Sequence, residues 1–138
     1  HRMSTAISID ADQPDSANSR KMPYDPHDAD DPETVIYRIS GAFFFGTASM
    51  VSSVLDRIAD QRKNFIIDFS NAPMIDSTAA NVVEGAARKA HKADVRILIT
   101  GGSPQIRRML VANGVRHPLV EFFPSIEDAL AEVHHAPG

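Results

Sequence analysis

The chain has 138 residues, a length that suits a single domain with a modest hydrophobic core. Its formal net charge is −4, from 14 lysines and arginines against 18 aspartates and glutamates, so it lacks the basic excess typical of nucleic-acid binders. It contains no cysteine, which excludes disulfides and thiol chemistry. Its apolar runs are much shorter than the roughly 18–20 residues that a membrane-spanning helix requires. The composition therefore predicts one globular domain without a nucleic-acid partner.

The first 33 residues differ in composition from the rest of the chain. The start His-Arg-Met does not resemble a native beginning, and we interpret residues 1–9 as a cloning remnant or a cut in a longer chain, with a short strand at 6–9. Residues 10–33 contain eight acidic residues and four prolines but few large apolar side chains. Such a segment buries too little area to offset its ordering entropy, so we expect a flexible acidic tether or, alternatively, a docking segment.

Two apolar runs open the folded part. Residues 35–39 are rich in β-branched and aromatic side chains, which predicts a strand. Residues 42–45 (Ala-Phe-Phe-Phe) predict a second strand, ended by Gly46, so that the two would form a hairpin-like opening. Thr47 is then expected to cap a helix whose apolar stripe recurs at helical spacing from Val51 to Ala59.

Strands and helices alternate in the remainder. We expect strands at 65–69, 95–100 and 119–123, and helices after Ser77, from Pro104 and from Pro124. This order predicts an α/β fold for residues 34–134: a mixed, mostly parallel sheet of about four to six strands, covered by about four helices. Residues 135–138 are expected to form a tail.

The most informative stretch lies between residues 65 and 80. A buried strand carries Asp68 near its end, and Asp76-Ser77-Thr78 then opens a helix. Asp76 or Ser77 at that position can be a helix cap. A phosphate on Ser77 or Thr78 would instead use the outward N–H groups of the helix start, which favour negative charge. The spacing by itself is compatible with either reading.

Two other positions resemble chemical motifs. Asp68 has the place of a phosphoacceptor, but the first strand ends without the acidic pair that would bind magnesium, so we expect backbone N–H groups to satisfy it. The turn at Gly102 and Ser103 precedes a helix and could contact an anion or nucleotide, although it lacks the Gly-Lys-Ser/Thr of a P-loop. A structural turn explains it more simply.

The sequence offers no enzyme chemistry. The histidines do not match the spacing of a closed metal site, and no nucleophile–base pair can be argued. We therefore expect no catalytic residue, no metal and no cofactor.

Four segments in this order resemble the STAS domain, the module shared by sulfate transporters and anti-sigma-factor antagonists. Residues 36–41 with Phe-Phe-Gly at 44–46 resemble the start of the version in bacterial SulP transporters. Residues 66–69 leading to Ile-Asp-Ser-Thr at 75–78 are similar to the signature turn of the family. The strand at 97–99 and the ending at 122–130 complete a resemblance that covers residues 34–134.

The resemblance to the transporter branch implies a non-catalytic regulatory domain of a SulP-type secondary transporter for sulfate or a related anion. It would lie on the cytoplasmic side of the inner membrane as part of an integral membrane protein. Its partners would be the transmembrane domain of the parent, a regulatory protein and, through the parent, a second copy, with Phe44 as one place to look for that contact. Its docking surface would comprise Asp76, Ser77, Thr78 and Asn81.

The resemblance to anti-sigma antagonists implies an alternative. In those proteins a kinase phosphorylates the hydroxyl directly after the Asp, which matches Ser77, and a second hydroxyl follows, as Thr78 does here. A glycine usually comes next, but this chain has Ala79. That departure, together with the Phe-Phe-Gly segment, favours the transporter branch over a free-standing antagonist switched at Ser77.

Overall fold

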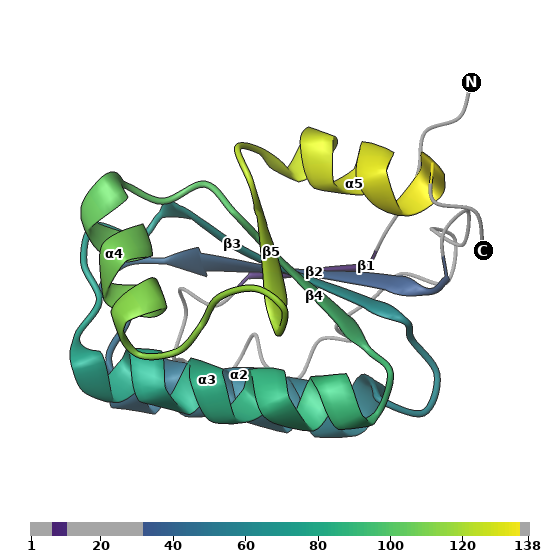
Figure 1. Cartoon of the computed structure of the whole chain (residues 1–138), viewed down its shortest axis with the longest axis horizontal. Helices are drawn as coiled ribbons and strands as arrows, with labels where there is room; N and C mark the ends of the chain where they lie inside the picture. Colours follow the sequence, from purple (N-terminus) through teal and green to yellow (C-terminus); the bar gives the residue numbers. More distant parts are fainter. Residues whose placement is uncertain (1–6, 11–31, 136–138) are drawn as a thin grey trace.

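The computed structural model describes residues 7–10 and 32–135 as a sheet flanked by helices (Figure 1). The strands are β1 (Ile7–Asp10), β2 (Thr34–Ser40), β3 (Asn64–Asn71), β4 (Arg96–Thr100) and β5 (Val120–Phe123). The helices are α2 (Phe45–Ile58), α3 (Ser77–Lys92), α4 (Pro104–Ala112) and α5 (Ile126–His135). The predicted α/β class is confirmed, and the short strand expected near the start corresponds to β1.

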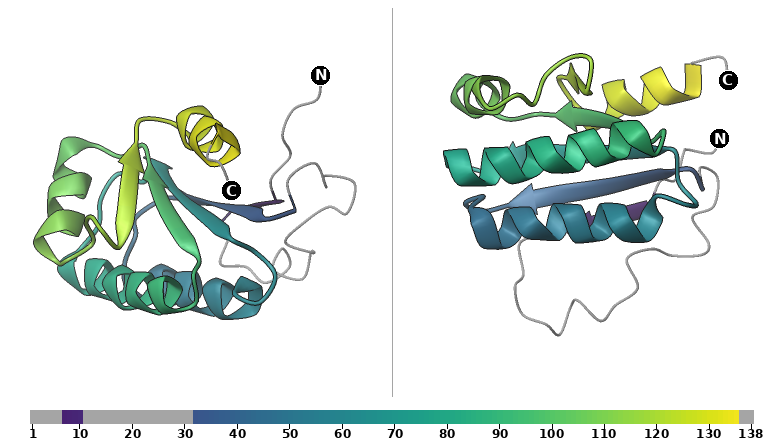
Figure 2. Two further views of the ribbon diagram at one scale, coloured as in Figure 1. Left: turned by 45° about the vertical axis from the view of Figure 1, so that its right-hand side comes forward. Right: turned by 60° about the horizontal axis from the view of Figure 1, so that its bottom comes forward.

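The sheet order is β1-β2-β3-β4-β5, and every pairing among the described strands is parallel. Parallel crossovers are right-handed, so strands added in one direction place their connecting helices on the same face. Accordingly α2 and α3 lie side by side against one face of the sheet, with α4 at the end of that face (Figure 2). Helix α5 lies on the opposite face of the sheet.

The core divides into two clusters that the sheet separates. The larger one joins the odd-numbered side chains of β2 and β3 to the buried stripes of α2, α3 and α4. Small residues make most of the α3 stripe, which lets this helix pack closely against its neighbours; they are Ala79, Ala80, Ala86, Ala87 and Ala90. The smaller cluster lies under α5 and contains Ile36, Ile66, Leu98 and Ala129.

The expected second strand at residues 42–45 is wrong, and so is the hairpin. After β2 the chain turns at Gly41, whose φ is +89°, and Phe43 makes only an isolated bridge to Ile75. Phe43 is buried in the core, where its ring lies edge-on to that of Phe69 with the ring centroids 5.2 Å apart. Helix α2 begins at Phe45, two residues before the expected cap Thr47, and its N-cap Phe44 makes no side-chain cap hydrogen bond.

The acidic segment falls mostly outside the described residues, since 11–31 are not described, and neither are 136–138 of the tail. Within the described part, no helix combines the length and the apolarity needed to cross a bilayer.

Candidate functional site

The candidate site lies at the edge of the sheet where β3 and β4 end. The carboxyl ends of parallel strands meet at one edge, so the starts of the following helices, α3 and α4, also gather there. Asp76 is the N-cap of α3, and its Oδ1 accepts a hydrogen bond from the backbone N–H of Ala79 at 2.8 Å. The capping interpretation of this motif is confirmed, with Asp76 rather than Ser77 as the cap.

The two hydroxyls that follow Asp76 have no part in that cap. Ser77 and Thr78 begin the first turn of α3, and both are exposed. Asn81, one turn further on, is also exposed. Because residues three and four apart share a helix face, these three side chains form one polar surface. We call Asp76, Ser77, Thr78 and Asn81 the α3 surface; whether it is a docking or phosphorylation site stays a prediction.

At the same edge of the sheet, Asp68 joins two strands through side-chain hydrogen bonds. Its Oδ1 accepts from the hydroxyls of Thr100 at 2.6 Å and Ser70 at 2.9 Å, and its Oδ2 accepts from the Ser70 backbone N–H at 3.3 Å. Asp68 is only 3% exposed and Thr100 is fully buried. Instead of the several backbone donors expected, one backbone N–H and two hydroxyls satisfy the carboxylate. The sequence did not single out Thr100, because its contact with Asp68 depends on the register of β3 and β4.

The loop before α4 is held against the same place. Ser103 is the N-cap of α4, and its hydroxyl accepts from the Ile106 backbone N–H at 3.2 Å, with Pro104 in the first turn as expected. Gly101 has φ of +68° and approaches Ser70 so closely that a Cβ would lie 2.9 Å from the Ser70 backbone nitrogen. The structural-turn reading of this loop is therefore supported, and anion contact at Gly102 and Ser103 stays a prediction.

An exposed apolar patch borders the α3 surface. Phe44, Phe45 and Met74 are 44%, 56% and 52% exposed. Phe43 N–H donates to the Met74 carbonyl at 2.9 Å, which brings the start of α2 beside the β3–α3 loop. We call Phe44, Phe45 and Met74 the apolar patch. The sequence analysis did not single out Phe45, because it placed the phenylalanines in a strand; the Phe-Phe-Gly run was the available signal. No sequence pattern pointed to Met74.

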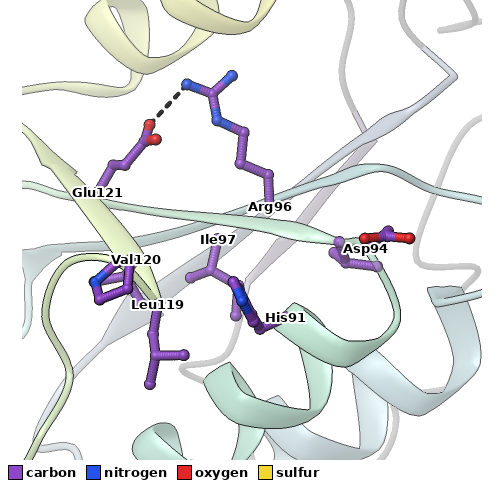
Figure 3. Close-up of a pocket in the computed structure, with 9 residues that line it drawn as sticks. His91, Asp94, Arg96, Ile97, Leu119, Val120 and Glu121 are labelled. Carbon is purple, nitrogen blue, oxygen red and sulfur yellow. Dashed lines mark hydrogen bonds and ion pairs between the residues drawn. The ribbon is translucent and has the colours of Figure 1, made fainter.

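A depression of about 280 Å³ lies at the opposite edge of the sheet (Figure 3). His91 near the end of α3 and Asp94 in the loop after it line the depression, together with the starts of β4 and β5. Arg96 and Glu121 point to the α5 side, where Arg96 Nη2 bonds Glu121 at 2.7 Å and Glu132 at 2.8 Å. Arg96 thus forms ion pairs with two carboxylates. The depression contains none of the candidate site residues that the sequence analysis named.

Among the described residues, no group of three or more His, Asp or Glu is arranged to hold a metal ion. The edge where β3 and β4 end combines an exposed polar helix start with exposed phenylalanine and methionine. Such a surface is suited to contact with another protein surface.

The comparisons with known proteins agree with this architecture. The STAS domain model matches residues 26–129, so the chain belongs to the STAS domain family. The crystal structure of a sulfate transporter family protein from Wolinella succinogenes is 30% identical with a TM-score of 0.67, covering 75% of this chain and 86% of that one. The SulP transporter STAS domain of Vibrio cholerae is 26% identical with a TM-score of 0.59, covering 75% and 86%.

One curated relative is a much longer protein. "Putative sulfate transporter YvdB" from Bacillus subtilis (strain 168) is 25% identical over 91 residues, which are 65% of this chain but 17% of that protein. The chain therefore spans about one sixth of its length. The unphosphorylated anti-sigma factor antagonist SpoIIAA shares the fold, with a TM-score of 0.63 at 19% identity over 78% of this chain and 93% of that one.

Proposed function

We propose that this chain is a non-catalytic regulatory domain of a SulP-type secondary transporter for sulfate or a related anion. One observation carries the proposal: the chain covers 86% of the Wolinella succinogenes sulfate transporter family protein, but only 17% of the longer relative YvdB. In this proposal residues 34–134 are the domain, and the parent chain holds it at the cytoplasmic side of the inner membrane.

The edge of the sheet supports a docking role within that parent. Phenylalanine and methionine side chains exposed together are costly in water and are typical of surfaces that another protein covers. Backbone contacts between Phe43 and residues 74–75 bring the apolar patch close to the polar α3 surface. An apolar area next to a polar one is typical of the centre and rim of an interface. We infer that these two surfaces together contact the membrane domain of the parent or a regulatory protein.

Two experiments test the proposal. The parent reading frame should encode roughly ten or more membrane-length apolar helices, and their absence would refute the proposal.

In the parent transporter, Phe45→Ser combined with Met74→Ser should weaken the association of this domain with the membrane domain. Met50→Ser is the matched control, because Met50 is an exposed apolar side chain of α2 outside the patch. Equal effects in both variants would refute the docking surface.

A free-standing antagonist switched at Ser77 is the second candidate, and one feature favours it. The hydroxyl of Ser77 is exposed, while Asp76 supplies the cap, so modification of Ser77 would leave the helix start intact. A cognate kinase with ATP should then phosphorylate Ser77, and Ser77→Asp should block partner binding, with Thr78→Asp as the control. An unmodified Ser77 and a binding-competent Ser77→Asp variant would exclude this candidate.

A further inference from the structure

Helix α4 and the loop after it concentrate positive charge in an otherwise acidic chain. No acidic residue occurs between Asp94 and Glu121 in the sequence. The same interval contains Arg107, Arg108 and Arg116, all exposed. The chain as a whole has a net charge of −4, so this local excess is not a consequence of general composition.

The three arginines surround an exposed apolar residue. Val111 is 39% exposed and lies four residues after Arg107 and three after Arg108, so that all three share one helix face. Arg116 joins them from the following loop, because its Nη1 donates to the Val111 carbonyl at 3.0 Å. We call Arg107, Arg108, Val111 and Arg116 the α4 basic patch. Both views place α4 at the margin of the molecule, away from β1 (Figures 1 and 2).

The positive charge of this patch is not neutralised within the described part of the chain. Arg107 and Arg108 form no ion pair with a carboxylate there. Glu84 packs near the end of α4, against Gly114, but its carboxylate is bonded to Arg88 at 2.7 Å. Among the described residues, no carboxylate therefore weakens the attraction of Arg107 and Arg108 for an external anionic surface.

We propose that the α4 basic patch binds the anionic headgroups of a membrane surface. Arginines at the rim attract anionic lipids, and an apolar side chain between them can enter the headgroup boundary. A nucleic acid is a poorer fit, because residues 103–117 contain no phenylalanine, tyrosine or tryptophan on which a base could stack. The idea rests on the proposed function, since a domain tethered to a transporter remains close to the bilayer.

A tryptophan at position 111 makes the contact measurable. The chain has no native tryptophan, so Val111→Trp introduces a single fluorophore. With vesicles of phosphatidylglycerol and phosphatidylcholine in equal amounts, its emission should shift to the blue at low salt, and high salt should reverse the shift. Vesicles of phosphatidylcholine alone should give no shift. Unmodified protein should co-sediment with the same mixed vesicles, which checks that the tryptophan did not create the binding.

Charge-matched variants test whether the patch is responsible. Arg107→Gln with Arg108→Gln should weaken binding by roughly 25-fold, from about fivefold for each basic side chain at an anionic surface. Arg57→Gln with Lys92→Gln removes the same charge from the ends of α2 and α3 and should leave binding unchanged.

Three results would overturn the proposal: no binding to anionic vesicles at low salt, equal loss in both double variants, or tighter binding to transfer RNA or polyglutamate than to the vesicles. The vesicle assay does not depend on the parent gene. A reading frame without membrane helices would therefore refute the proposed function, whereas the vesicle assay would still decide whether the α4 basic patch binds anionic lipids.

Discussion

The hydroxyl of Thr100 donates a hydrogen bond to Asp68 Oδ1 at 2.6 Å, joining the ends of two adjacent strands in the interior. Thr100→Val keeps the shape of the side chain and removes this donor from a carboxylate that is almost fully buried. We expect a loss of about 1.5–3 kcal/mol in the free energy of unfolding, the usual worth of a hydrogen bond to a charged group. Urea unfolding at neutral pH measures it.

The exposed Thr78 supplies the control for that substitution. Thr78→Val should change the unfolding free energy by less than about 0.5 kcal/mol, as surface substitutions usually do. If the two variants lose the same stability, the bond between Thr100 and Asp68 contributes nothing of its own.

Gly101 should tolerate no side chain. Its φ of +68° disfavours any L-residue, and an added Cβ would lie 2.9 Å from the Ser70 nitrogen and 3.0 Å from its Cα. Gly101→Ala should therefore cost at least about 1–2 kcal/mol from the backbone alone, and more from the contact. Gly46→Ala, near the start of α2 with open space around it, should be neutral or stabilising in the same unfolding assay. An unaffected Gly101→Ala protein would contradict the close approach of Gly101 to Ser70 of β3.

The caps of α3 and α4 can be separated from the hydroxyls beside them. Asp76→Ala and Ser103→Ala each remove a side-chain acceptor from a helix start, and each should cost about 0.5–2 kcal/mol of unfolding free energy. Ser77→Ala should leave thermal stability almost unchanged, because Asp76 supplies the cap. If Ser77→Ala lost more unfolding free energy than Asp76→Ala, Ser77 rather than Asp76 would be the cap.

Local patterns predicted the parts of the fold that depend on neighbours in sequence. The stripe of α2 from Val51 onward, the proline and serine at the start of α4, and the apolar strand around Ile67 are all short-range signals, and each is confirmed. The fold class followed from the alternation of strands and helices.

The errors arose where tertiary packing decides the conformation. Phe43, Phe44 and Phe45 form an apolar run that is equally compatible with a strand. Only the turn at Gly41 and the burial of Phe43 against Phe69 determine that α2 begins there. Likewise, the local sequence does not reveal that Thr100 would meet Asp68, because their contact depends on the register of β3 and β4.

Tyr37 carries a hydroxyl that is buried without a hydrogen-bond partner among the described residues. An unpaired buried polar group costs about 1–3 kcal/mol, so Tyr37→Phe should leave stability unchanged or raise it by up to that amount. Tyr37→Ala is the contrasting variant and should lose about 3–5 kcal/mol, because it leaves a cavity beside Phe65. Destabilisation of Tyr37→Phe at neutral pH would mean that the hydroxyl has a partner.

The same residue predicts a pH dependence. Burial raises the pKa of Tyr37 to about 12 from 10.0, the effect of the nearby Arg57 being smaller and opposite. The unfolded chain therefore ionises at this position before the folded one does, so the native protein loses stability as the pH rises from about 10 to about 12. Two pKa units correspond to about 2–3 kcal/mol. Tyr37→Phe lacks this loss, so its advantage in unfolding free energy should grow by that amount between pH 9 and pH 12. Parallel curves for the two proteins would show that Tyr37 ionises as readily in the folded state as in the unfolded one.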